Sequence, residues 1–112
     1  MTLRNDRGAG AVLALALVMA VVVIGLAGVT LAAGLSARQR IIGAADLAAL
    51  AAADAASGAI GGMPCRVAAD VAGANGTRLA GCETVGLVVT VTVAGSFAGI
   101  PIEARSTAGP PA

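Results

Sequence analysis

The stretch from Gly8 to Ala37, GAGAVLALALVMAVVVIGLAGVTLAAGLSA, contains no charged residue. It is longer than the roughly 20 apolar residues that a helix needs to cross about 30 Å of hydrocarbon. In lipid, a single segment can satisfy its own backbone hydrogen bonds only as a helix. The sequence therefore predicts a transmembrane helix over residues 8–37, preceded by a short tail over residues 1–7.

A cleaved signal peptide is the main alternative to a retained membrane anchor. Arg4 and Arg7 form a basic start, and small residues such as Thr30 and Ala32 could precede a cleavage point. The apolar core of a signal peptide is typically about 7 to 15 residues, much shorter than this one. We therefore favour the anchor, and keep as alternatives an exported small domain released by cleavage and a small regulatory membrane protein.

The orientation of the span follows weakly from the flanking charges. Arg4 and Arg7, offset by Asp6, stand against Arg38 and Arg40 on the other side. The short tail is the simpler part to leave in the cytoplasm, and a cysteine pair downstream suits an oxidising exterior. We expect a single-pass cell-membrane protein with a cytoplasmic N-terminus and an extracytoplasmic C-terminal part.

The composition argues against nucleic-acid binding and against catalysis. The net charge is +1, the cationic residues are scattered, and phosphate binding needs a concentrated basic face. The chain has no His or Lys to act as a base beside a serine nucleophile, and its carboxylates form no close pair. We expect a protein that is not an enzyme and binds no cofactor, metal or nucleic acid.

The two cysteines, Cys65 and Cys82, both follow the apolar stretch. A metal site would need three or four ligands, which this chain without histidine does not supply. A disulfide is the expected state on an oxidising side of the membrane, with two free buried thiols as the alternative. The pair would close a loop of about 17 residues and stabilise a small module by roughly 3 kcal/mol.

Small residues recur four positions apart within the span, as at Gly28 and Ala32. This spacing lets a second helix approach closely in lipid, although any alanine-rich helix contains such pairs by chance. The span therefore offers a surface for contact with lipid and for helix-mediated self-association.

Residues 38–58 are predicted to continue the helix beyond the membrane. The stretch GAADLAALAAADAA has Leu47 and Leu50 as its only large apolar residues and Asp46 and Asp54 as its only charges. Small side chains favour close helix contact, so we expect this segment to pack against partner helices, with Asp46, Leu47 and Leu50 in the contact. Glycines and Pro64 then end the helix.

Residues 59–106 are predicted to form a small α/β module stapled by the disulfide, which makes the chain an α+β protein. We expect a short helix over residues 64–74 and a three-stranded antiparallel meander. The segments TRLAGCE, LVVTVTV and IPIEARS are the expected strands, glycines 86, 95 and 99 the expected turns, and residues 107–112 a disordered tail. The residues expected to face the core are Leu87, Val89, Val91, Val93, Ile100 and Ile102 from the strands and Cys65, Ala68, Ala69 and Ala72 from the helix.

The order of these parts resembles the TadE/TadG-like minor pseudopilins of the tight adherence (Flp) pilus, and most closely the short actinobacterial TadE-like proteins encoded beside secretion genes. The resemblance rests on RGAGAVLALAL and RQRIIGAADLAALAAADAA, in which Gln39, Asp46 and Ala48-Ala49-Leu50 match the family pattern. It implies other Tad/Flp-type pilus or secretion components as partners.

The same resemblance places a peptidase cut at Gly8. Leu13, however, occupies the position where the family often has a glutamate that acts in assembly. We therefore expect an uncleaved, membrane-retained minor component.

Overall fold

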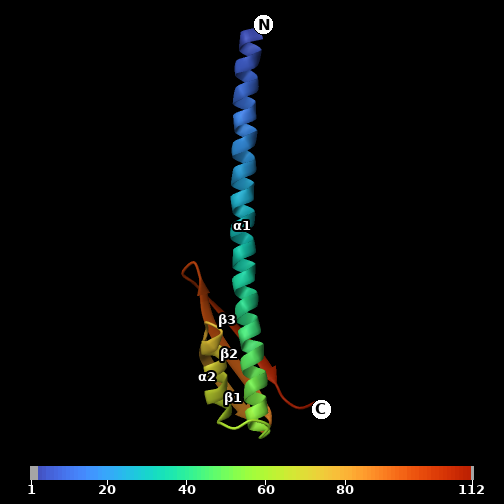
Figure 1. The fold of residues 1–112 in the computed structure, drawn as a ribbon, viewed down its shortest axis with the longest axis vertical. Coiled ribbons are helices and arrows are strands. Elements are labelled where there is room, and N and C mark those ends of the chain that lie inside the picture. The colour runs from blue at the N-terminus through green and yellow to red at the C-terminus, as the bar shows by residue number, and fades with distance from the viewer. Residues whose placement is uncertain (1–2, 112) are drawn as a thin grey trace. The chain divides into compact units, whose positions relative to one another are not determined.

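The computed structural model describes residues 3–111, with side chains from Gly8 onward, and divides into two units. The first unit ends at Gly34, and the second begins at Leu35. The elements, labelled in Figure 1, are α1 (Leu3–Ala56), α2 (Pro64–Ala74), β1 (Arg78–Val85), β2 (Val88–Phe97) and β3 (Ile100–Ala108). The predicted α+β class, with a long apolar helix, a short helix and a three-stranded antiparallel sheet, is confirmed.

The first unit consists of α1 residues with exposed apolar side chains. Every residue from Gly8 to Ala33 is exposed, including Ile24 at 70%. The Thr30 hydroxyl donates a hydrogen bond to the carbonyl of Leu26 at 2.9 Å, so this polar group has its partner within the helix. By length and composition, α1 is able to cross a membrane.

The second unit is built on a sheet with strand order β1-β2-β3, in which both pairs are antiparallel. Val89, Val91 and Val93 of β2 are fully buried on one face, and the alternating Thr90 and Thr92 lie on the other. The predicted alternation is confirmed for these residues. Leu87 is 47% exposed, because it lies in the β1–β2 turn, so its predicted place in the core is wrong.

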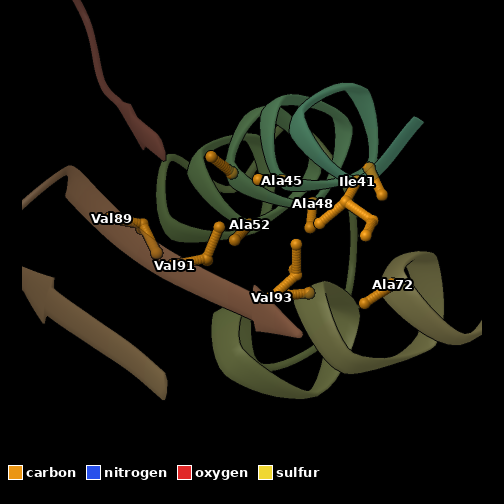
Figure 2. Close-up of a cluster of buried hydrophobic side chains, with 11 residues drawn as sticks. Ile41, Ala45, Ala48, Ala52, Ala72, Val89, Val91 and Val93 are labelled. Atoms are coloured by element: carbon orange, nitrogen blue, oxygen red, sulfur yellow. The ribbon is translucent and has the colours of Figure 1, made fainter. Parts of the chain in front are cut away.

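The alanine-rich part of α1 packs into the core of the second unit. Figure 2 shows these alanines facing the buried valines of β2. The alanines of the predicted 38–58 extension therefore pack within the chain and not on a partner, whereas the expected contact of Asp46, Leu47 and Leu50 with a partner helix stays a prediction. The buried α1 residues are Ile41, Ala44, Ala45, Ala48, Ala49 and Ala52.

The helix α2 confirms the predicted segment and completes this core. Ala68 and Ala72 are fully buried, whereas Ala69 is exposed, so its predicted place on the inner face is wrong. The region predicted as a helical extension and the region predicted as a separate module thus share one set of buried residues.

Gly95 marks a close approach between α1 and β2 and not the predicted turn. A Cβ atom at this position would lie 2.8 Å from Cδ1 and 3.0 Å from Cγ1 of Ile41. The missing side chain therefore gives Ile41 its space on the sheet.

The third strand is longer than predicted, and its start is more exposed. β3 extends to Ala108, so Thr107 and Ala108 belong to the sheet and not to a disordered tail. Ile102 packs against the core as predicted, but Ile100 is 64% exposed because it directly follows the β2–β3 turn.

Enlarging a buried alanine of α1 tests its packing on the sheet. We expect Ala48→Leu to lower the free energy of unfolding by about 1–3 kcal/mol, because the larger side chain must displace β2 or α1. The control Ala69→Leu makes the same change at an exposed site, where an effect within about 0.5 kcal/mol is expected. Denaturant unfolding of the full chain in detergent micelles measures both; equal effects would contradict this packing.

The β2–β3 turn offers a stabilising substitution. Ala98 and Gly99 have φ angles of 51° and 78°, as in a type I′ turn, which favours Asn-Gly. We expect Ala98→Asn to raise the free energy of unfolding by roughly 0.5–1 kcal/mol, because asparagine tolerates the left-handed conformation better than alanine. A decrease in the same unfolding measurement would contradict this turn geometry.

Candidate interaction surfaces

The disulfide between Cys65 and Cys82 joins the start of α2 to β1, as predicted. A β-bulge between Leu79 and Gly81 makes this link geometrically accessible. Strict alternation would put Leu79 and Cys82 on different faces of the sheet. The extra residue of the bulge instead pairs Leu79 with Val93 and Cys82 with Val91, so both lie on the same face. Cys82 thereby reaches the face of the sheet that the helices cover.

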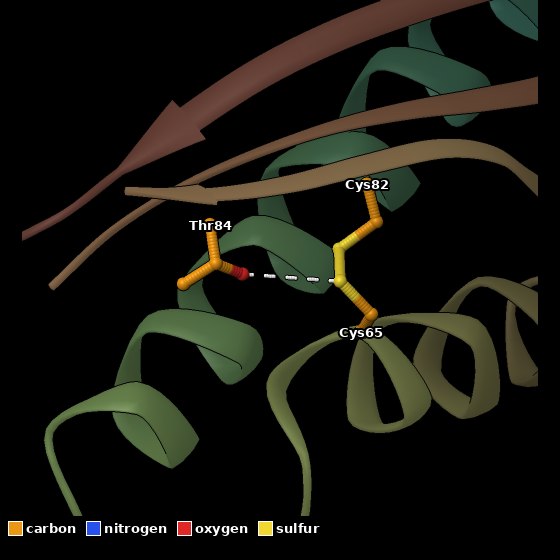
Figure 3. The surroundings of a disulfide bond; sticks show 3 residues. All are labelled: Cys65, Cys82 and Thr84. Carbon is orange, nitrogen blue, oxygen red and sulfur yellow. Dashed lines mark hydrogen bonds between the residues drawn. A yellow bond between two sulfur atoms is a disulfide. The ribbon is translucent and has the colours of Figure 1, made fainter. Parts of the chain in front are cut away.

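Thr84 lies next to this bond, as Figure 3 shows. Its Oγ1 is 3.9 Å from the Sγ of Cys65. Because a disulfide sulfur carries no proton, the threonine hydroxyl is the donor in this weak contact.

Replacing both cysteines by serine tests the contribution of the disulfide. With a sequence separation of 17, we expect the Cys65→Ser/Cys82→Ser chain to lose about 3 kcal/mol of unfolding free energy, because the unfolded chain gains freedom. Denaturant unfolding under oxidising and reducing conditions gives the comparison. The double variant should be insensitive to reductant, and a wild-type chain that is equally insensitive would contradict this role.

The outer face of α1 in the second unit is the first surface available to a partner. Leu47 and Leu50 are 51% and 57% exposed, and Asp54 is also exposed. The Ser106 hydroxyl of β3 donates a hydrogen bond to Oδ1 of Asp46 at 2.6 Å. We call Asp46, Leu47, Leu50 and Asp54 the outer ridge.

A groove of about 180 Å³ adjoins the outer ridge. Leu50 and Asp54 line it from α1, and Ala108 and Pro110 line it from the end of the chain. It therefore combines apolar walls with one carboxylate, a lining that suits the long stem and cationic head of an arginine or lysine side chain.

The remaining predicted site residues lie in the first unit. Gly28 and Ala32 are exposed on α1, one helical turn apart, and Gly8 and Leu13 are exposed near its start. A Cβ atom at Gly28 would meet nothing within 4 Å. Helix packing at Gly28 and Ala32 and processing at Gly8 stay predictions.

A second apolar surface was not predicted from the sequence. The contact of Thr84 with Cys65, and the closeness of Gly109 to Val88, bring the α1–α2 loop, the β1–β2 turn and the end of β3 to one end of the second unit. The sequence signal that could have indicated this surface is the presence of large apolar residues next to turn glycines. We call the exposed side chains there the apolar tip: Ile60, Met63, Val85, Leu87 and Val88.

The described side chains form no metal-binding cluster, and a second groove lies on the sheet. Among residues 8–111, no three histidine, cysteine or acidic side chains lie close enough to hold a metal ion. A second groove, of about 530 Å³, lies on the uncovered face of the sheet and has Arg78 and Glu103 as its charged residues.

Comparison with protein-family models, with curated proteins and with solved structures finds no match to this chain.

Proposed function

We propose that this chain is a non-enzymatic, membrane-anchored, pseudopilin-like component of a Flp/Tad-type pilus or secretion apparatus. The observation that supports this proposal most is that the two parts of α1 differ in burial. Its apolar residues from Gly8 to Ala33 are exposed, whereas Ala44, Ala45, Ala48, Ala49 and Ala52 form part of a folded core. A protein that anchors a folded extracytoplasmic module in a bilayer needs both segments.

Partner binding in this proposal uses the outer ridge. Burial of the alanine face fixes the rotation of α1, so Leu47, Leu50 and Asp54 point away from the core. A partner helix can pack on the leucines while a basic residue approaches Asp54 in the adjoining groove. Within the bilayer, Gly28 and Ala32 supply a second contact of the small-residue kind.

The non-enzymatic role rests on the residue inventory. The chain contains no histidine to pair with a serine, and the two cysteines are joined to each other. The outer ridge and the apolar tip are instead surfaces of the kind that bind other proteins.

One observation favours the exported domain as a second candidate. A cut near Ala33 or Arg38 would leave Ile41 and all the buried residues of the second unit on one fragment. The released fragment would therefore keep its core, and the alternative is physically sound.

Intact-mass measurement separates these two candidates. We expect the full-length chain in the membrane fraction, because the long apolar segment is retained in the bilayer. A soluble fragment in the medium that begins near Ala33 or Arg38 would contradict the anchor and support the exported domain.

Site-specific photo-crosslinking tests the outer ridge in living cells. A photoreactive residue at Leu50 should form adducts with pilus or secretion membrane components identified by mass spectrometry, because this side chain is exposed beside the groove. Asp70, on the exposed side of α2, is the matched control and should give none. Identical adducts from both positions, or none from Leu50, would contradict a partner surface on α1.

A further inference from the structure

The β2–β3 hairpin, residues 97–100, is an uncharged and exposed feature of the second unit. Ile100 is 64% exposed, and Ala98 and Gly99 are also exposed. Phe97 is the only aromatic residue of the chain and is half-buried. No charged residue occurs in the sequence between Glu83 and Glu103, so the hairpin has no charge that would oppose contact with lipid.

The fold places this hairpin at the end of the second unit where α1 enters it. The close approach of Ile41 to Gly95 places these two residues at the same level along α1 and β2. From Gly95 to the turn, β2 rises by roughly 10 Å, at about 3.3 Å per residue. The same rise along a helix takes about six or seven residues, so a strand running parallel to α1 brings the turn level with about residue 35.

That level coincides with the end of the predicted transmembrane segment at Ala37. Arg38 and Arg40 follow directly and are exposed. Arginines next to a span are typical anchors at the membrane–water interface. The hairpin and these arginines therefore lie where the headgroup region of the bilayer would be if α1 spans it.

We propose that the β2–β3 hairpin inserts the side chain of Ile100, and the exposed part of its strand partner Phe97, into the interfacial layer of the membrane that α1 crosses. This inference rests on the proposed membrane anchor. Shallow burial of apolar side chains at the headgroup boundary is the mode used by interfacial segments. The hairpin would give the module a second attachment to the bilayer, while the apolar tip at the opposite end of the sheet stays available to proteins.

Tryptophan fluorescence of the reconstituted full chain tests this contact, because the natural sequence contains no tryptophan. Three variants carry one tryptophan each: Ile100→Trp in the hairpin, Leu87→Trp in the turn at the opposite end, and Val22→Trp in the span. Each is placed in vesicles of phosphatidylcholine with a minority of phosphatidylglycerol. Two probes are used, phosphatidylcholine brominated on its acyl chains near the headgroup for positions 100 and 87, and near the chain ends for position 22 at the bilayer centre; each quenches tryptophan at its own depth.

We expect a blue-shifted emission and strong quenching at position 100, and neither at position 87. Quenching at position 22 without quenching at position 100 would overturn the hairpin contact and leave the anchor intact. Absence of quenching at position 22 would instead overturn the anchor, and the hairpin proposal with it.

A second measurement applies if Ile100→Trp disturbs the fold, as judged by loss of the wild-type circular dichroism. In the wild-type chain in nanodiscs, a spin-labelled lipid should broaden the methyl signals of Ile100 and not those of Leu87. Equal broadening of both, or of neither, would overturn the proposal.

Discussion

The packing of the α1 alanines on the β2 valines is the contact on which the rest of the second unit depends. Ala48 and Ala52 bring only methyl groups to the interface, so the helix backbone can lie close to Val89, Val91 and Val93. β-Branched valines suit the sheet and present a stiff surface to the helix. Since this contact supplies most of the buried residues, the helix that leaves the predicted membrane segment is itself part of the folded module.

The other features secure the periphery of this contact. The bulge in β1 turns Cys82 toward α2, and the disulfide then holds α2 beside the sheet. Gly95 of β2 leaves space for Ile41, the first buried residue of α1. With the inner face of α1 fixed in this way, Leu47 and Leu50 are held outward, so the packing that makes the core also leaves these two side chains exposed.

Local patterns predicted most of the elements, whereas long-range contacts decided what they bury. The period-2 pattern from Val88 to Val93 and the Pro64 helix start were enough to locate a strand and α2. The destination of the alanine face could not be predicted, because small side chains suit a partner helix and a sheet equally well. Leu87 and Ile100 were misplaced for a related reason: alternation specifies a face but not where helix cover ends. The residues of the outer ridge were identifiable from the sequence because they lie on one helix. The apolar tip was not, because its residues come from separate loops that meet only in the folded chain.

The most direct test of the helix–sheet contact is the measurement of methyl–methyl nuclear Overhauser effects between Ala48 and Val91 in the full chain in detergent micelles. We expect strong effects in a uniformly labelled sample and none between chains in a mixed-label sample, because the contact lies within one molecule. Effects seen only between differently labelled chains would show that the alanine face packs on a partner, and would contradict the central role of the helix–sheet contact.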